Sequence, residues 1–323
     1  MNPLALLPDR YSAENVRRVL RNPRLLRREL FTVALTANSR TRDVLNALER
    51  TDDGIDVIAA DWDNLLILDA CRYDLFAARA TLEGDLREVR SKGSDSGEFM
   101  QRNFAGRTLH DTVYVTANPH VHHLEDGVFH AVVDLLEDRW DEAAETVRPE
   151  AVVEEAIAAH ERFPEKRLIV HFMQPHFPFL GPTGQTFAHQ GIDADLENRD
   201  PGKANPWFRL IYDDDVDVAT VRRAYRENLD LVLPHVEDLL EALSGKSVVT
   251  ADHGNLIGER GFPVPVPMYG HPRGLHRDDL LAVPWLEVAS TDRRRVLPEP
   301  PVDGRDNPDE DVLERRLTAL GYA

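Results

Sequence analysis

Cysteine is nearly absent from this sequence: the 323-residue chain holds one, Cys71. A single thiol cannot form a disulfide within the chain, and it excludes a zinc site built from several cysteines. Long hydrophobic runs are missing as well, since stretches such as residues 64–68 fall far short of the roughly 20 apolar residues that span a bilayer. The first residues carry no secretory-signal pattern, so the sequence predicts a cytoplasmic location.

Lysine is the second scarcity. Of the 38 basic residues only four are lysines, and the 57 acidic residues bring the net charge to -19. A surface of this charge repels nucleic acid, so we expect no nucleic-acid partner. An acidic excess with few lysines also predicts a halophilic protein that works at high salt, where screening is strong. An ordinary acidic protein is the alternative interpretation.

The charge is unevenly distributed along the chain. Residues 1–50 hold ten arginines and five acidic residues, a net charge of +5, which leaves -24 for the remainder. Apolar residues lie beside the arginines on both sides of Pro23, and this pattern predicts two short amphipathic helices. We therefore assign residues 1–58 to a basic helical arm that packs on the acidic body. Contact of the arm with a membrane surface or a protein partner is the alternative.

From residue 59 onward, short apolar strands alternate with helical stretches. This alternation predicts an α/β fold, a doubly wound, mostly parallel sheet with helices on both faces. Residues 59–323 would form one large domain, with a loop rich in Gly, Pro, Asp and Asn at 181–216 as a cap over the site. The expected strands are 65–68, 113–116, 168–172, 248–250 and 281–288, and the expected helices are 72–82, 131–145, 150–162, 219–243 and 309–320.

Acidic residues follow two of the predicted strands. Asp69 ends the first strand, and Asp252 and His253 follow the strand at 248–250. Ligands of α/β proteins gather at the carboxyl ends of strands, and a carboxylate buried there is costly unless a positive charge pairs with it. Oxygen and imidazole ligands suit zinc, manganese, magnesium or calcium. The three side chains therefore predict a divalent metal site; a helix cap or turn residue is the alternative for each aspartate.

Four ordered motifs resemble those of the alkaline phosphatase/sulfatase superfamily. Residues 68–75 resemble its opening strand followed by D-x-x-R-x-D, and residues 171–179 resemble its H-x-M-D-P-H-x-P-Y segment. Residues 250–259 resemble the T-x-D-H-G-x-x-x-G-E signature, and residues 269–272 with 283–286 resemble the histidine and V-P elements that follow it. The motifs stand in the family's order.

The resemblance implies a doubly wound α/β catalytic domain and a set of site residues. Asp69, Asp252 and His253 would bind the metal ion. His176 and His271 would face the substrate oxyanion or the leaving group, where ester cleavage at phosphorus or sulfur develops charge. A histidine that caps a proline-rich turn is the structural alternative for His176.

Two positions depart from the family pattern. Gln174 stands where many two-metal relatives have aspartate, which argues against a second metal ion. Cys71 lacks the proline and the second arginine of C-x-P-x-R, so we expect no formylglycine there but a small buried residue. Arg72 and Asp74 are expected to pair and brace the turn. A loose histidine cluster is expected at the surface or behind the site: His120, His122, His123 and His130.

The family places its nucleophile in a turn that opens a helix, and the matching segment here is 91–99. Gly93 and Gly97 permit a tight backbone, and two acidic residues in the segment have the spacing of a helix-capping pair. Ser96 would lie in the first helical turn, where free amides and the helix dipole favour an anion. We predict Ser96 as the nucleophile. Ser94 is the rival, and a serine that only caps the helix is the structural alternative.

Three functions follow, in this order. The first is metal-dependent hydrolysis of a phosphate or sulfate ester, from a small molecule or a glycan, through a covalent serine intermediate. The second is transfer of a phospho-alcohol group to a glycan or lipid. The third is a non-catalytic binding protein that keeps the fold.

The acidic surface generates a prediction about salt. If the surface is an adaptation to high salt, lowering the salt from molar to low ionic strength should weaken the folded state, because carboxylate repulsion is then unscreened. Circular dichroism followed across this range should show loss of structure at the low-salt end. Full structure at low ionic strength would return the chain to the class of ordinary acidic proteins.

Overall fold

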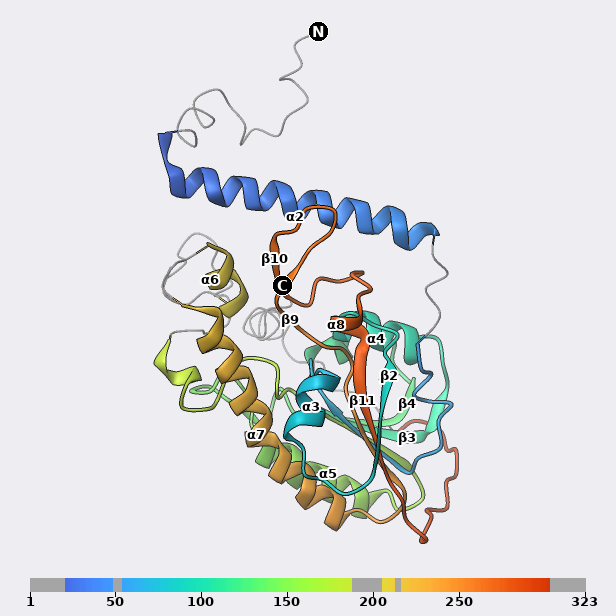
Figure 1. The fold of residues 1–323 in the computed structure, drawn as a ribbon. Helices are drawn as coiled ribbons and strands as arrows, with labels where there is room; N and C mark the ends of the chain where they lie inside the picture. The colour runs from blue at the N-terminus through green and yellow to red at the C-terminus, as the bar shows by residue number, and fades with distance from the viewer. Residues whose placement is uncertain (1–20, 49–53, 188–204, 213–215, 303–323) are drawn as a thin grey trace.

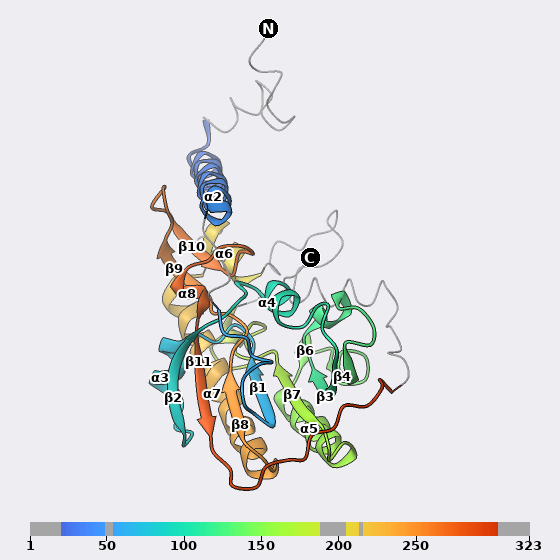
Figure 2. The ribbon, with the colours of Figure 1, turned by 90° about the vertical axis from the view of Figure 1, so that its right-hand side faces the viewer.

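A computed structural model describes residues 21–48, 54–187, 205–212 and 216–302. At its centre lies a seven-stranded sheet in the order β2-β11-β8-β1-β7-β3-β4 (Figure 1, Figure 2). Strand β11 is antiparallel to both of its neighbours, and the other strands share one direction. The strands are β1 (Asn64–Leu68), β2 (Asp85–Arg90), β3 (Leu109–Thr116), β4 (Phe129–Asp134), β7 (Arg167–Phe172), β8 (Ser247–Thr250) and β11 (Ala282–Val288).

The central strand β1 is buried along its whole length. A continuous apolar run of this kind fits a parallel strand that is covered on both faces. Its register sets Leu68 opposite Phe172 of β7 and Ile67 opposite Thr250 of β8. The segments that leave β1 and β8, and the last residues of β7, therefore emerge side by side at one edge of the sheet.

Helices cover both faces of the sheet, which confirms the predicted fold class. On one face, α5 (Pro149–Arg162) packs on β7 and β3, and it contacts α7 (Val218–Ala242), which in turn contacts α3 (Tyr73–Arg79). On the other face lies α4 (Ser96–Asn103), and Phe104 at its end packs edge-on against Tyr114 and Phe129 of the sheet. The two layers bury one continuous apolar core.

The arm is a single helix in the described residues, α2 (Pro23–Leu48), and it lies across the same end of the molecule as α4 and α8 (Asp278–Leu281) (Figure 1). It rests on the hairpin of β9 (Leu256–Arg260) and β10 (Pro267–Gly270). The Asn38 amide donates to the Val264 carbonyl at 2.9 Å, and the Val264 N–H donates back to Asn38 at 2.8 Å. Pro23 begins α2; the helix predicted before it lies largely outside the described residues.

Some predicted elements differ from the structure. The helix expected at 131–145 is wrong: residues 129–134 form β4, which pairs in parallel with β3, and the short strands β5 (Trp140–Asp141) and β6 (Thr146–Val147) follow. Pairing with β3 decides against the helix at this β-branched segment. Of the expected cap, the described parts hold η4 (Gly184–Thr186) and α6 (Pro206–Tyr212). Residues 188–204 and 213–215, and the tail helix expected at 309–320, lie outside the described residues.

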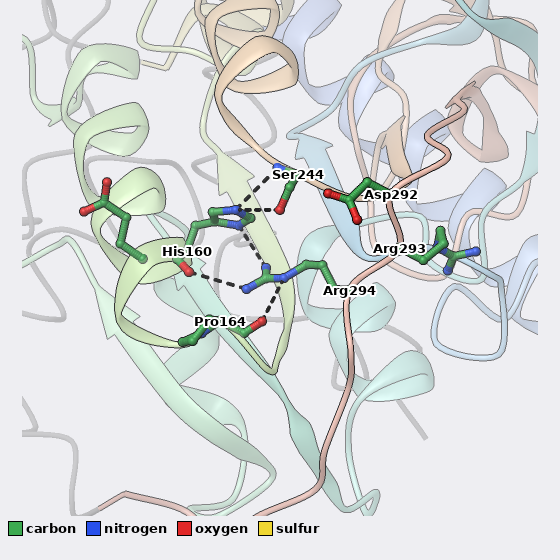
Figure 3. A pocket seen from close by; sticks show the side chains of 7 residues that line it. His160, Pro164, Ser244, Asp292, Arg293 and Arg294 are labelled. Carbon is green, nitrogen blue, oxygen red and sulfur yellow. Dashed lines mark hydrogen bonds between the residues drawn. The ribbon is translucent and has the colours of Figure 1, made fainter.

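After β11, the chain crosses beneath the amino ends of the strands, where Arg294 lines a cavity of about 290 Å³ (Figure 2, Figure 3). There His160 lies 3.2 Å from the Ser244 hydroxyl. The Arg294 guanidinium donates to Nδ1 of His160 at 2.9 Å, and burial together with Arg294 lowers the pKa of His160 to about 4. The Ser244 N–H also donates to Nε2 of the same ring, at 3.4 Å. These contacts join the end of α5, the turn before β8 and the segment after β11.

Candidate metal and catalytic site

Three neighbouring strands bring ligand atoms together at the carboxyl edge of the sheet. Asp69 follows β1, Asp252 follows β8, and His171 is the penultimate residue of β7. One ligand atom from each of the three lies within 4.8 Å of the others, and all three side chains are fully buried. The strand order β8-β1-β7 alone produces this convergence of residues that are far apart in the sequence.

The charge at this point calls for a cation. Two buried carboxylates face each other, and burial lowers the pKa of His171 to about 4, so the imidazole contributes no positive charge at neutral pH. Its Nε2 lies 3.8 Å from Asp69 Oδ2 and 3.7 Å from Asp252 Oδ2, without a hydrogen-bond partner among the described residues. Paired buried carboxylates are costly without a compensating ion. The residues present therefore fit a divalent metal ion.

His253, which follows Asp252 after β8, is the fourth side chain beside the two carboxylates. Its Nδ1 donates to the Gly254 carbonyl at 2.7 Å, which leaves the lone pair on Nε2. That nitrogen lies 3.5 Å from Asp252 Oδ2 and 3.7 Å from Asp69 Oδ1. An imidazole held by a backbone carbonyl through its other nitrogen is the usual arrangement of a metal-ligating histidine. The structure thus brings the three predicted ligands together and adds His171 to them.

The two carboxylates are held in place by the backbone and by an asparagine. The Asn118 amide donates to Asp69 Oδ2 at 2.6 Å. Asp252 Oδ1 accepts from the N–H groups of Ala70 at 3.0 Å and of His253 at 2.8 Å. Ala70 adopts a left-handed φ of 58°, and its carbonyl accepts a hydrogen bond from the Tyr225 hydroxyl. These contacts fix the turn after β1, so the carboxylate oxygens point at one place.

Ser96 lies where the sequence predicted it, at the first residue of α4. Its hydroxyl oxygen is 2.7 Å from Asp252 Oδ2, 3.1 Å from Asp69 Oδ2 and 3.3 Å from His253 Nε2. The helix begins as expected, because the Asp95 side chain accepts from the N–H of Glu98 at 2.6 Å. Ser96 is fully buried. An uncharged hydroxyl thus lies among the predicted ligands, at a helix N-terminus.

Ser94, the rival nucleophile, is held by other partners. Its hydroxyl donates to Glu98 Oε2 at 2.8 Å and accepts from the N–H of Gly274 at 2.8 Å. These bonds join the turn before α4 to the loop that follows β10. Ser94 has a clear structural role, and no hydrogen bond connects it to the predicted ligands in the described residues.

A positive group flanks the first turn of α4. A Cβ atom placed on Gly97 would lie 3.1 Å from His120 Nδ1 and 3.2 Å from Arg273 Nη1. The absence of a side chain at Gly97 therefore lets an imidazole and a guanidinium approach the helix beside Ser96. Together with the dipole of the helix N-terminus, Arg273 favours an anion at this point.

His176 and His271 lie next to His253. The rings of His253 and His271 are 4.6 Å apart, and those of His271 and His176 are 5.0 Å apart. The N–H of His176 donates to the Asp69 carbonyl at 3.1 Å. Asn228 of α7 holds the proline-rich turn, because its amide lies 2.8 Å from the His176 carbonyl and also reaches the carbonyls of Pro175 and Pro178. All six predicted site residues are therefore adjacent.

The protonation states of His176 and His271 determine whether they can donate a hydrogen bond to a substrate. Nδ1 of His176 donates to the Phe177 carbonyl at 2.6 Å, and burial lowers the pKa of His176 to about 3. Burial, with His253, His176 and His120 nearby, also lowers the pKa of His271 well below its usual value. In the neutral state, Nε2 of His176 carries a lone pair. It can donate to an oxyanion only after it takes up a proton, which the negative charge of a bound substrate favours.

The residues that border the site behave largely as predicted. Cys71 is fully buried, and burial raises the pKa of its thiol well above the usual value. Arg72 binds Asp74 through two hydrogen bonds of 2.8 and 2.7 Å, and it also reaches Glu259 at 2.6 Å. The arginine therefore connects the first motif to the third, at residues 250–259. In the histidine cluster, His120 and His130 are buried and only the others are partly or fully exposed.

Sequence reasoning missed the role of His171 and of the residues behind it. The Tyr114 hydroxyl lies 2.7 Å from His171 Nδ1, which directs Nε2 at the carboxylates. A histidine near the end of an otherwise apolar, buried strand beside β1 was the available signal. No such signal marks Asn118 or Asn228, because their contacts join segments about 50 residues apart or more.

Comparisons with known proteins found similar folds but no sequence relatives. No family model and no curated protein matches the chain. Solved structures do match. One is the integral membrane protein lipooligosaccharide phosphoethanolamine transferase A from Neisseria meningitidis, at 14% identity and a TM-score of 0.41; the match covers 71% of this chain and 48% of that one. This chain thus spans about half of that protein.

Two further matches are domains of similar size. The C-terminal periplasmic domain of phosphoethanolamine transferase EptC from Campylobacter jejuni is 10% identical, with a TM-score of 0.43, and the match covers 70% of this chain and 78% of that one. The periplasmic domain of EcEptC from Escherichia coli, in complex with zinc, is 12% identical, with a TM-score of 0.44 and coverage of 73% and 75%. At such identities and TM-scores the likeness concerns the fold alone.

These matches contradict the prediction of a cytoplasmic location. The similar structures are periplasmic domains and an integral membrane protein. The cytoplasmic prediction is therefore wrong by this comparison and is withdrawn. Within the described residues, none of the helices combines the length and the apolar character needed to cross a bilayer.

The site generates a prediction about metal binding. We expect Asp252→Asn and His171→Gln to weaken binding of a divalent metal by at least about tenfold, since each removes a ligand atom or its lone pair. Elemental analysis after dialysis against graded metal concentrations measures this. The matched control is Asp74→Asn, which changes a neighbouring carboxylate that binds Arg72 outside the ligand group. Equal metal content in the wild type and the three variants would show that these residues do not bind the metal ion.

Proposed function

We propose that this protein is an enzyme that transfers a phosphoryl- or sulfuryl-type group from an ester to Ser96. The observation that carries the proposal is the place of the Ser96 hydroxyl, 2.7 Å from Asp252 Oδ2 and 3.1 Å from Asp69 Oδ2 at the N-terminus of α4. A serine that only capped the helix would not need two buried carboxylates and an imidazole around it. In this helix the capping side chain is that of Asp95.

The first step forms a bond between Ser96 Oγ and phosphorus or sulfur while the bond to the ester oxygen breaks. The Ser96 hydroxyl, which donates a hydrogen bond to Asp252 Oδ2, gives its proton to the solvent as the bond forms. A divalent ion held by Asp69, Asp252 and His253, with His171 beside them, would supply positive charge that favours the alkoxide and the developing oxyanion. Arg273 and the first amides of α4 bind the non-bridging oxygens of the substrate.

His176 and His271 serve the leaving group and the second nucleophile. With substrate bound, either histidine takes up a proton on Nε2 and gives it to the departing ester oxygen. In the second step the same nitrogen, again bearing a lone pair, takes a proton from the molecule that attacks the Ser96 intermediate. Their neutral state in the absence of substrate follows from burial.

The acceptor in the second step separates the two candidate enzyme functions. Attack by water gives hydrolysis of a phosphate or sulfate ester, our first expectation. Attack by an alcohol on a glycan or lipid gives a phospho-alcohol transferase, and the named structural matches are mainly phosphoethanolamine transferases. Both functions share Ser96 and the first step. Product analysis with aryl phosphate, diester and sulfate substrates, with and without an added alcohol such as glycerol, separates them.

Ser96 provides the direct test of the proposal. Ser96→Ala should keep the fold and the bound metal but lose turnover and any covalent intermediate, because among the described residues Ser96 supplies the hydroxyl beside Asp69 and Asp252. Intact-protein mass spectrometry after rapid acid quench measures the intermediate, and an aryl-ester assay measures turnover. Ser94→Ala is the matched control and should stay active. Activity in both variants would remove the covalent mechanism, and a wild type inactive on every ester class would support a binding protein.

The two histidines provide a separate test of proton transfer. His176→Ala and His271→Ala should each lower kcat by on the order of tenfold to a thousandfold while the metal content stays unchanged. The variants should lose less activity on an aryl ester with a good leaving group than on one with a poor leaving group, because a good leaving group departs without being protonated. Loss of activity that is the same for both leaving groups would assign the histidines a structural role.

A further inference from the structure

The exposed apolar side chains of this protein gather on the arm and the loop beside it. Within the described residues, five large hydrophobic side chains are strongly exposed, and four of them belong to α2 or to the β9–β10 loop. They are Leu30 at 61%, Val33 at 50%, Val44 at 61% and Phe262 at 70% exposure. The fifth, Val302, belongs to the C-terminal segment.

The three α2 residues share one side of the helix. Leu30, Val33 and Val44 follow the spacing i, i+3 and i+14, which an α-helix places within a narrow stripe about 20 Å long. Arg40 lies in the same stripe and is exposed. A neighbouring side of α2 faces the body of the protein, since Ala34 and Asn38 are buried and Leu35 packs on the apolar cluster around Met268. Among the described residues, these contacts leave the outer stripe exposed.

The charge of this region is opposite to that of the body. Residues 1–50 carry +5, against -24 for the rest of the chain. A surface that repels the acidic body and attracts the arm must itself be anionic. A helix with arginines beside a narrow aliphatic stripe, and low overall hydrophobicity, has the character of an interfacial helix that lies in the headgroup region of a bilayer. The stem of Arg40 can lie along the stripe while its guanidinium reaches the headgroups.

The inner side of α2 is joined to the candidate site. Arg42 donates to the His276 carbonyl, and the His276 ring lies 2.8 Å from Glu98 of α4. Glu98 in turn binds Ser94 in the turn before Ser96. The arm and the site lie at the same end of the molecule (Figure 1). A surface that binds α2 would therefore lie at the same end of the molecule as the site.

We propose that the outer stripe of α2, with the adjoining β9–β10 loop, docks this protein on an anionic lipid surface. The stripe is defined by Leu30, Val33 and Val44, and the loop contributes Phe262. The aliphatic side chains enter the headgroup boundary, and Arg40, which is exposed in the same stripe, pairs with lipid phosphates. The proposal stands independently of the reaction at Ser96, because binding needs no turnover.

Vesicle binding of the full chain tests the proposal. Vesicles of phosphatidylcholine with an equal part of phosphatidylglycerol should sediment the protein, vesicles of phosphatidylcholine alone should not, and added salt should weaken the binding. The combined variant Leu30→Ser, Val33→Ser and Val44→Ser should lower the partition coefficient by at least about tenfold, since three exposed aliphatic groups no longer enter the bilayer. Val302→Ser, an exposed valine outside the arm, is the matched control and should bind like the wild type.

Two further measurements keep the outcome decisive. Phe262→Ser changes an exposed loop residue, so it should fold even if the combined variant does not, and it should also weaken vesicle binding. Light scattering gives the oligomeric state of the wild type and the variants. Unchanged vesicle binding in the variants would overturn the proposal. It would equally be overturned if the wild type bound no vesicles and the combined variant turned a dimer into a monomer, since the stripe would then join two copies of the chain.

Discussion

The burial of two carboxylates at adjacent strand ends is the constraint around which this structure is organised. Asp69 and Asp252 have no exposed surface, and the imidazole that faces both of them is neutral. Such a pair costs several kcal/mol unless hydrogen bonds and a cation offset it. The Asn118 amide and the N–H groups of Ala70 and His253 supply the hydrogen bonds. A cation has to supply the rest.

Hydrogen bonds from several surrounding segments hold the two carboxylates in place. The left-handed turn at Ala70 is secured by Tyr225 of α7, and the same helix fixes the proline-rich turn through Asn228. Arg72 connects the turn to the β9 segment through Glu259. Four segments that are distant in the sequence are thus fastened to one another by buried polar contacts. Such networks hold a site rigid when every member is satisfied.

The same polar contacts continue outward to the arm. Glu98 contacts both Ser94 and the His276 ring, and the His276 carbonyl accepts a hydrogen bond from Arg42 of α2. The acidic body and the basic arm are therefore joined at the end of the molecule that holds the site. The arm carries a net positive charge and the rest of the chain a net negative one, and hydrogen bonds hold the two together. A charged surface therefore attracts one end of the molecule and repels the other, which orients the molecule.

The sequence by itself determined the class of the fold and predicted most of the candidate site. Apolar runs such as residues 65–68, alternating with helical stretches, indicated the α/β fold, and Asp69, Ser96, Asp252 and His253 could be predicted because their motifs are local. The tertiary structure decided what depends on neighbours across the sheet. The strand order placed His171 beside Asp69, pairing with β3 made a strand of 129–134 where a helix was expected, and the partners of Ser94 separated it from Ser96. These outcomes rest on contacts between distant segments, and no local pattern of residues encodes such contacts.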